Sequence, residues 1–160
     1  MLTDAETPAT VANFLDYVDA AFYDDLVFHR VIEDFMVQGG GFSASLHEKS
    51  HNAAIVNEAS TGLSNLYGTI AMARTSDPDS ATDEFYINVK DNTFLDYSAS
   101  SPGYCAFGRV IDGMDVVLAI SKVATHTQSG MSDIPSFPVT ITSARRVDCN
   151  ALSFDTTTFH

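Results

Sequence analysis

The chain has 160 residues, 45% hydrophobic and 18% charged, a composition typical of one compact globular domain. Its 21 acidic residues outnumber 8 Lys and Arg residues, giving a formal net charge of −13. This acidic excess argues against binding to nucleic acids or anionic membrane surfaces, which attract basic proteins. Cys105 and Cys149 have no CxxC spacing, so neither a disulfide framework nor a thiolate zinc site is expected.

The first part of the chain predicts a helix, two strands and a long loop. Residues 7–18 favour a helix, because Thr7 offers a hydroxyl N-cap, proline follows it, and apolar residues then recur at helical spacing. Residues 25–32 and the FMVQ segment at 35–38 predict strands. Residues 43–66 carry polar residues and glycines without steady periodicity, which indicates a loop.

The second part of the chain is expected to be mainly extended. Further strands are predicted at 68–73, 84–89, 104–111 and 137–147. A short helix is predicted at 113–123. The fold class is therefore mostly β, with about six strands and two helices. Without an internal repeat or a linker, we expect a single domain at 1–147 followed by a tail at 148–160.

The segment HEKSH at residues 47–51 matches the HExxH pattern of zinc hydrolases. That pattern has chemical meaning only on a helix, where the two histidines share a face and the glutamate acts as a base. The flanking sequences lack an amphipathic repeat, and no third ligand is evident. We therefore predict loop histidines and no metal. The alternative, a zinc hydrolase built on His47, Glu48 and His51, predicts activity that a chelator abolishes.

The segment FHRVIEDFMVQGGGF at residues 28–42 places an arginine within an apolar strand. Strand alternation predicts one shared surface for Arg30, Met36, Gln38, Glu84 and Tyr86. The apolar members alone would suggest plain core, but Arg30 carries five donors that need partners, which Gln38 and Glu84 could supply. His29 is predicted on the opposite face, as a hydrogen-bonded core histidine.

Four segments together resemble the cyclophilin-type peptidyl-prolyl isomerases, the bacterial members above all. They are FHRVIEDFMVQGGGF, NEASTGLSNLYGTIAMAR, SATDEFYINVKDNTFLD and YCAFGRVIDGMDVV, in this order. The resemblance runs from about Pro8 to Val147 and implies an eight-stranded antiparallel closed barrel with two capping helices. It implies an enzyme that accelerates rotation about X–Pro bonds in peptides and folding proteins, without a metal or other cofactor.

The resemblance also implies roles for individual residues. Arg30 would be the catalytic residue. The proline pocket would consist of Phe35, Met36, Tyr86, Leu95, Phe94 and Tyr104. The peptide backbone would be held by Gln38, Ala73, Arg74 and Glu84.

The chain departs from the family pattern within this site. Glu84 stands where Gln is usual, and pairing with Arg30 is expected to lower the activity. Phe94 stands where many members have Trp, so cyclosporin binding is expected to be weak. Tyr104 replaces a frequent His but keeps a ring and a polar tip. The alternative function is a proline-binding or chaperone module with little catalysis, in which Glu84 silences Arg30.

The start of the chain is shorter than the family pattern. The first two family strands precede the first helix, and here only residues 1–7 do so. We expect either a longer natural chain or cover from the tail segment ALSFDTTTFH. A longer chain could carry a signal peptide, so both cytoplasm and periplasm are expected locations. The protein is expected to be a monomer.

Overall fold

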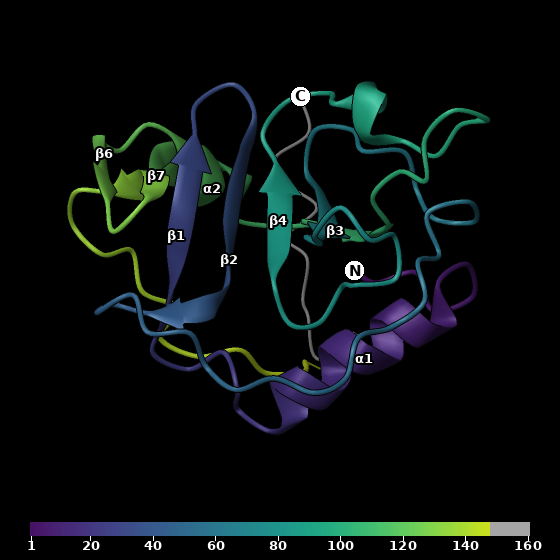
Figure 1. Ribbon diagram of the computed structural model, residues 1–160, viewed down its shortest axis with the longest axis horizontal. Helices are drawn as coiled ribbons and strands as arrows, with labels where there is room; N and C mark the ends of the chain where they lie inside the picture. Colours follow the sequence, from purple (N-terminus) through teal and green to yellow (C-terminus); the bar gives the residue numbers. More distant parts are fainter. Residues whose placement is uncertain (148–160) are drawn as a thin grey trace, which may run out of the picture.

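The computed structural model describes residues 1–147 and is mostly β with two α-helices (Figure 1). The tail at 148–160, including ALSFDTTTFH, lies outside the described residues. The helices are α1 (Pro8–Asp19), the 3₁₀-helix η1 (Thr93–Leu95) and α2 (Met114–Ser121). The strands are β1 (Leu26–Ile32), β2 (Met36–Ser43), β3 (Thr69–Met72), β4 (Phe85–Asn88), β5 (Ala106–Arg109), β6 (Thr125–Gln128) and β7 (Met131–Pro135). No helix in the described range is long and apolar enough to span a membrane.

The predicted helices and most predicted strands are confirmed within a few residues, but β2 extends to Ser43, five residues beyond the predicted FMVQ segment. One strand prediction is wrong, and one hairpin was not predicted. Residues 137–147 form no regular strand and pair with β1 only through an isolated bridge between Val27 and Thr140. The β6–β7 hairpin was not expected, because all residues of β6 are polar and exposed. Ser129 and Gly130 between its strands have φ values of 53° and 81°, the backbone conformation that a tight hairpin turn requires.

The main sheet is five-stranded and antiparallel, in the order β1-β2-β4-β3-β5. Both of its outer strands are partly covered by further backbone pairing. On β1, the amide of Phe28 donates to the Val139 carbonyl at 2.9 Å, and on β5 the amide of Arg109 donates to the Met1 carbonyl at 2.8 Å. The polar groups of the outer strands are therefore partly satisfied within the chain, which limits their tendency to pair with other molecules.

The start of α1 is capped differently from the prediction. Thr7 is the N-cap residue, but its hydroxyl donates to the carbonyl of Thr3 at 2.9 Å instead of accepting from the helix. The carboxylate of Glu58 takes its place and accepts from the amides of Ala9 at 3.2 Å and Thr10 at 2.8 Å. A carboxylate at this end also complements the positive pole of the helix dipole. The long loop thereby fixes α1 in position.

The two helices cover different parts of the sheet (Figure 1). The ring of Phe14 on α1 packs against Phe107 of β5 and Phe85 of β4, with centroid distances of 5.2 and 5.6 Å. The apolar side of α2 instead packs on the buried residues Val31 and Val37 of β1 and β2. These two layers fix the sheet while leaving its remaining surface for the site described below.

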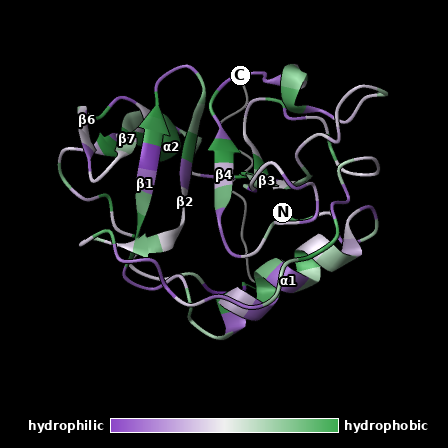
Figure 2. Ribbon diagram, viewed as in Figure 1, coloured by the Kyte–Doolittle hydropathy of each residue, from purple (hydrophilic) through white to green (hydrophobic). Residues whose placement is uncertain are grey.

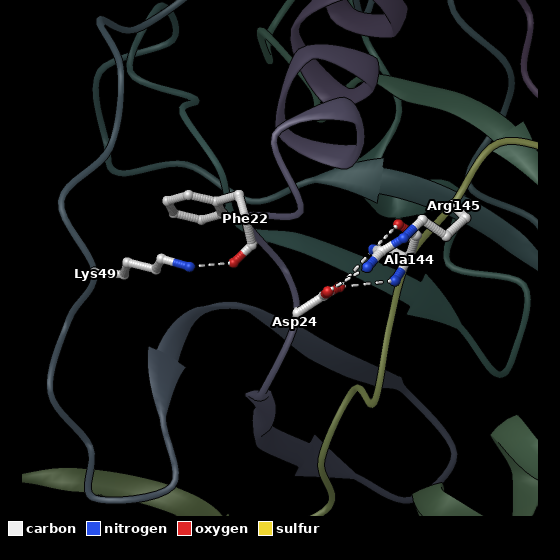
Figure 3. Close-up of polar contacts among 5 residues, drawn as sticks. All are labelled: Phe22, Asp24, Lys49, Ala144 and Arg145. Atoms are coloured by element: carbon white, nitrogen blue, oxygen red, sulfur yellow. Dashed lines mark hydrogen bonds and ion pairs between the residues drawn. The ribbon is translucent and has the colours of Figure 1, made fainter.

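Polar contacts attach the later chain to the turn between α1 and β1 (Figure 3). Arg145 forms a two-pronged pair with Asp24, with distances of 2.8 and 2.5 Å, and the amide of Ala144 donates to the same carboxylate. From the opposite side, Lys49 donates to the Phe22 carbonyl at 2.6 Å. Two segments distant in sequence are thus fastened to one turn beside β1.

Truncating Phe107 is expected to destabilise the fold strongly, because its side chain is 0% exposed. Phe107→Ala is expected to lower the free energy of unfolding by about 3–5 kcal/mol, because it removes apolar burial and leaves a cavity. Phe137→Ala is the matched control, since that ring is 85% exposed, and should cost less than about 0.5 kcal/mol. Urea unfolding measures both, and equal effects would contradict the packing described.

Candidate active site

The register of three neighbouring strands brings polar residues together in the middle of the sheet. Arg30 on β1 lies opposite Gln38 on β2, and Gln38 lies opposite Tyr86 on β4. Figure 2 shows the corresponding hydrophilic band midway along β1, between hydrophobic ends. Strand alternation therefore placed these three side chains correctly on one surface.

These strands and the loops beside them enclose a cavity of about 230 Å³. Its lining contains nine of the eleven predicted site residues: Arg30, Phe35, Met36, Gln38, Ala73, Arg74, Tyr86, Leu95 and Tyr104. Most of the wall is apolar or aromatic, and the polar side chains in the lining include the two arginines and Gln38. Such a cavity suits a small apolar ring attached to a polar backbone.

The other two predicted residues, Phe94 and Glu84, lie beside the cavity. The ring of Phe94 is 70% exposed and stacks on Phe35 with a centroid distance of 5.9 Å, so it extends the apolar rim. Glu84 lines a neighbouring cavity of about 440 Å³, which shares Gln38, Ala73 and Arg74 with the first. An elongated ligand could thus contact both cavities.

The two arginines of the cavity differ in how their donors are used. Arg74 donates from Nε and Nη2 to the Gly103 carbonyl and from Nη1 to the Thr75 carbonyl, and it lies over the ring of Tyr104 at 4.2 Å. Arg30 has its Nε 3.9 Å from the Asp133 carboxylate, and its terminal nitrogens make no hydrogen bond within residues 1–147. Arg30 is therefore the cation with donors available to a ligand, while Arg74 supports the wall.

The expected pairing of Glu84 with Arg30 is not observed. The Glu84 carboxylate instead accepts a hydrogen bond from Gln38 Nε2 at 2.7 Å, and His29 Nε2 lies 3.2 Å from the same oxygen. His29 is buried and its Nε2 has a partner, as predicted, whereas its Nδ1 has no hydrogen-bond partner among the described residues. The β1–β2 register is irregular between Phe28 and Arg30, and His29 contacts the site residue Glu84. The premise that Glu84 draws Arg30 away is therefore wrong.

The surroundings of Glu84 favour its ionised form. Burial raises the pKa of this carboxyl, but the hydrogen bonds from His29 and Gln38, with the proximity of His29, outweigh burial and lower the pKa from its ordinary value. The carboxylate thus holds the amide nitrogen of Gln38, while the amide oxygen of Gln38 accepts no hydrogen bond from residues 1–147.

Three buried asparagines that the sequence reasoning missed support the cavity wall. Asn65, Asn88 and Asn92 are at most 2% exposed. The Tyr86 hydroxyl donates to Asn65 at 2.8 Å, Asn92 donates to Asn88 at 2.8 Å, and Asn92 also donates to the Phe35 carbonyl at 2.9 Å. Asn88 also donates to Asn65 at 3.2 Å, so one continuous hydrogen-bond network connects the wall residues Tyr86 and Phe35. The sequence signal that could have indicated this network is the repeated asparagine in the NEASTGLSN and INVKDN segments.

The HEKSH segment does not form a helix. Glu48 makes an isolated bridge with Phe42, and His51 Nε2 lies 4.0 Å from the Glu48 carboxylate. The two histidines therefore do not share a helical face, as the zinc-hydrolase pattern requires. In the described part of the chain, no group of three or more His, Cys, Asp or Glu side chains is arranged to hold a metal ion.

Comparison with known proteins identifies the family of this chain. Residues 1–146 match the family described as "Cyclophilin type peptidyl-prolyl cis-trans isomerase/CLD". The chain is 54% identical over 147 residues to the peptidyl-prolyl cis-trans isomerase cyp18 of Streptomyces antibioticus, covering 90% of this chain and 89% of that protein. It is 50% identical over 143 residues to peptidyl-prolyl cis-trans isomerase B of Escherichia coli, covering 88% of this chain and 87% of that protein.

A solved structure shares the fold at lower identity. The cyclophilin type peptidyl-prolyl cis-trans isomerase of Cryptosporidium parvum, solved in the presence of the dipeptide Ala-Pro, is 21% identical, with a TM-score of 0.74. The match covers 92% of this chain and 91% of that chain. The chain therefore belongs to the cyclophilin-type peptidyl-prolyl cis-trans isomerase family. Its activity is that of a prolyl isomerase, as the high identity to the bacterial enzymes shows.

The environment of Glu84 predicts a specific dependence of stability on pH. Because the folded pKa is lowered, the carboxylate stabilises the fold above its ordinary pKa of 4.5, and this contribution is lost as the pH falls through the folded pKa. We expect the stability advantage of the parent over Glu84→Gln to be larger at neutral pH than at about pH 3. Urea unfolding of both proteins at each pH tests this, and an advantage that grows on acidification would contradict it.

Proposed function

We propose that Arg30 catalyses the isomerisation by donating a hydrogen bond to the prolyl nitrogen as the X–Pro bond twists. The observation that carries the proposal is a guanidinium at an apolar cavity whose terminal nitrogens make no hydrogen bond within residues 1–147. Amide resonance makes the bond rotate slowly, with a barrier of about 20 kcal/mol. Twisting breaks this resonance and leaves a lone pair on the prolyl nitrogen. A donor aimed at that lone pair stabilises the twisted state more than either planar state.

The cavity wall supplies the other half of the proposed mechanism. The pyrrolidine ring is held among Phe35, Met36 and Leu95, with Phe94 extending the rim. The amide oxygen of Gln38 and backbone groups near Ala73 hold the peptide on either side. With the ring fixed, the acyl part of the substrate is free to rotate. These steps require no nucleophile and no cofactor.

The substrates we propose are proline-containing peptides and unfolded or folding proteins. Support comes from the cavity, which is open to the surface and of a size for a proline ring, and from the related Cryptosporidium cyclophilin solved with Ala-Pro. We further propose that the protein acts as a monomer. We also propose that it binds cyclosporin weakly, because Phe94 has no indole N–H to donate. The closed barrel is also proposed, supported by the backbone pairing found on both outer strands of the sheet.

Removing the guanidinium tests the catalytic role directly. Arg30→Ala is expected to lower kcat/KM for a proline peptide by about 10²–10³-fold, as when one electrostatic donor to a transition state is removed. A protease-coupled isomerisation assay measures this effect. Peptide affinity should change little, because the apolar cavity is retained.

The control for this variant is Arg109→Ala, which removes an exposed cation that lies outside the cavity lined by Arg30. It should retain the parental activity. Full activity in Arg30→Ala would contradict the proposal. Peptide binding without acceleration by the parent would instead support the alternative, a proline-binding module.

The position of Glu84 leads to a second activity prediction. Because its carboxylate is held by Gln38 and His29, Glu84→Gln should change kcat/KM at neutral pH by no more than about twofold. The same coupled assay with the parent as reference measures the ratio. A tenfold rise in the variant would show that Glu84 restrains Arg30 after all.

A further inference from the structure

The β6–β7 hairpin carries an acidic residue to the candidate active site. Strand β7 packs beside β1, and Ile134 anchors the hairpin in the core with 6% exposure. The next residue toward the turn, Asp133, has its Oδ2 atom 3.9 Å from Arg30 Nε. Asp133 does not line the cavity itself, so its link to the reaction runs through Arg30.

The backbone of Asp133 is in an unusual conformation. Its φ is 63°, in the left-handed region that residues with a Cβ rarely adopt, although Asp and Asn tolerate it better than others. The hydroxyl of Ser132 donates to Asp133 Oδ2 at 2.9 Å, which fixes the carboxylate further. The chain thus holds this carboxylate in a set position beside Arg30.

Stability alone does not account for this arrangement. The side chains of Arg30 and Asp133 are 41% and 36% exposed, and ion pairs with such exposure contribute little to folding. The contact with Asp133 instead affects the orientation of the Arg30 guanidinium. A guanidinium is a rigid planar fork, so a carboxylate on its Nε edge constrains where the two terminal nitrogens point.

We propose that Asp133 is a positioning residue for the isomerisation. Its carboxylate attracts the Nε edge of Arg30 and thereby directs Nη1 and Nη2 toward the prolyl nitrogen in the cavity. This inference rests on the proposed catalytic role of Arg30. The contact at 3.9 Å is an ion pair and not a hydrogen bond, and it can shorten when a substrate orders the site.

The test begins with Asp133→Asn, which removes the charge but keeps the shape and the tolerance for positive φ. We expect kcat to fall about threefold to fivefold, with peptide affinity and thermal stability unchanged. Asp133→Gly removes the carboxylate while relieving the backbone, and should lose the same activity without loss of stability. The matched control is Asp25→Asn, an exposed aspartate whose φ is also 63° and which lies outside the cavity. It should keep parental activity.

A double-mutant cycle with Arg30→Ala separates positioning from general disturbance. If Asp133 acts through the guanidinium, Asp133→Asn should have no further effect once Arg30 is replaced. The same fold-loss in both backgrounds, or parental activity in Asp133→Asn beside an impaired Arg30→Ala, would overturn the inference. Parental activity in Arg30→Ala would instead overturn the proposed role of Arg30 itself.

Discussion

The site depends on one constraint: a guanidinium lies beside an apolar cavity while its terminal nitrogens make no hydrogen bond to the described part of the chain. A buried or half-buried arginine ordinarily finds acceptors for its donors, as Arg74 does with the carbonyls of Gly103 and Thr75. Among residues 1–147, Arg30 does not, because the carboxylate paired with it, Asp133, lies 3.9 Å from Nε. The strong candidate acceptor, Glu84, is already engaged by Gln38 and His29.

The rest of the fold keeps this arrangement rigid. The strand register fixes Gln38 between Arg30 and Tyr86, and the packed helices hold the strands from other sides. The buried asparagines join the hydroxyl of Tyr86 to the backbone of Phe35, which restricts the movement of these two wall residues relative to each other. A preorganised wall matters for this reaction, since differential stabilisation of a twisted bond requires the ring and the donor to keep their relative positions.

Part of this arrangement was predictable from the sequence. Alternation along extended segments placed Arg30, Gln38 and Tyr86 on one surface, and the motif resemblance added residues outside the strands, such as Leu95 of η1. The contact between His29 and Glu84 was not predictable, because it depends on a local irregularity in the β1–β2 register. In the sequence, the asparagines of the network look like ordinary polar surface residues, and their burial is evident only from the structure. Strand β6 consists of exposed polar residues and shows no apolar alternation. The β6–β7 hairpin was therefore not predicted, and neither was the position of Asp133.

The central claim is that the free nitrogens of Arg30 meet the prolyl nitrogen while the cavity holds the ring. A crystal structure of the protein with an Ala-Pro peptide tests this most directly. We expect the pyrrolidine ring between Phe35 and Leu95, with a terminal nitrogen of Arg30 within about 3.5 Å of the prolyl nitrogen. A peptide bound in this cavity with the guanidinium turned to solvent, or a proline ring bound elsewhere, would contradict it.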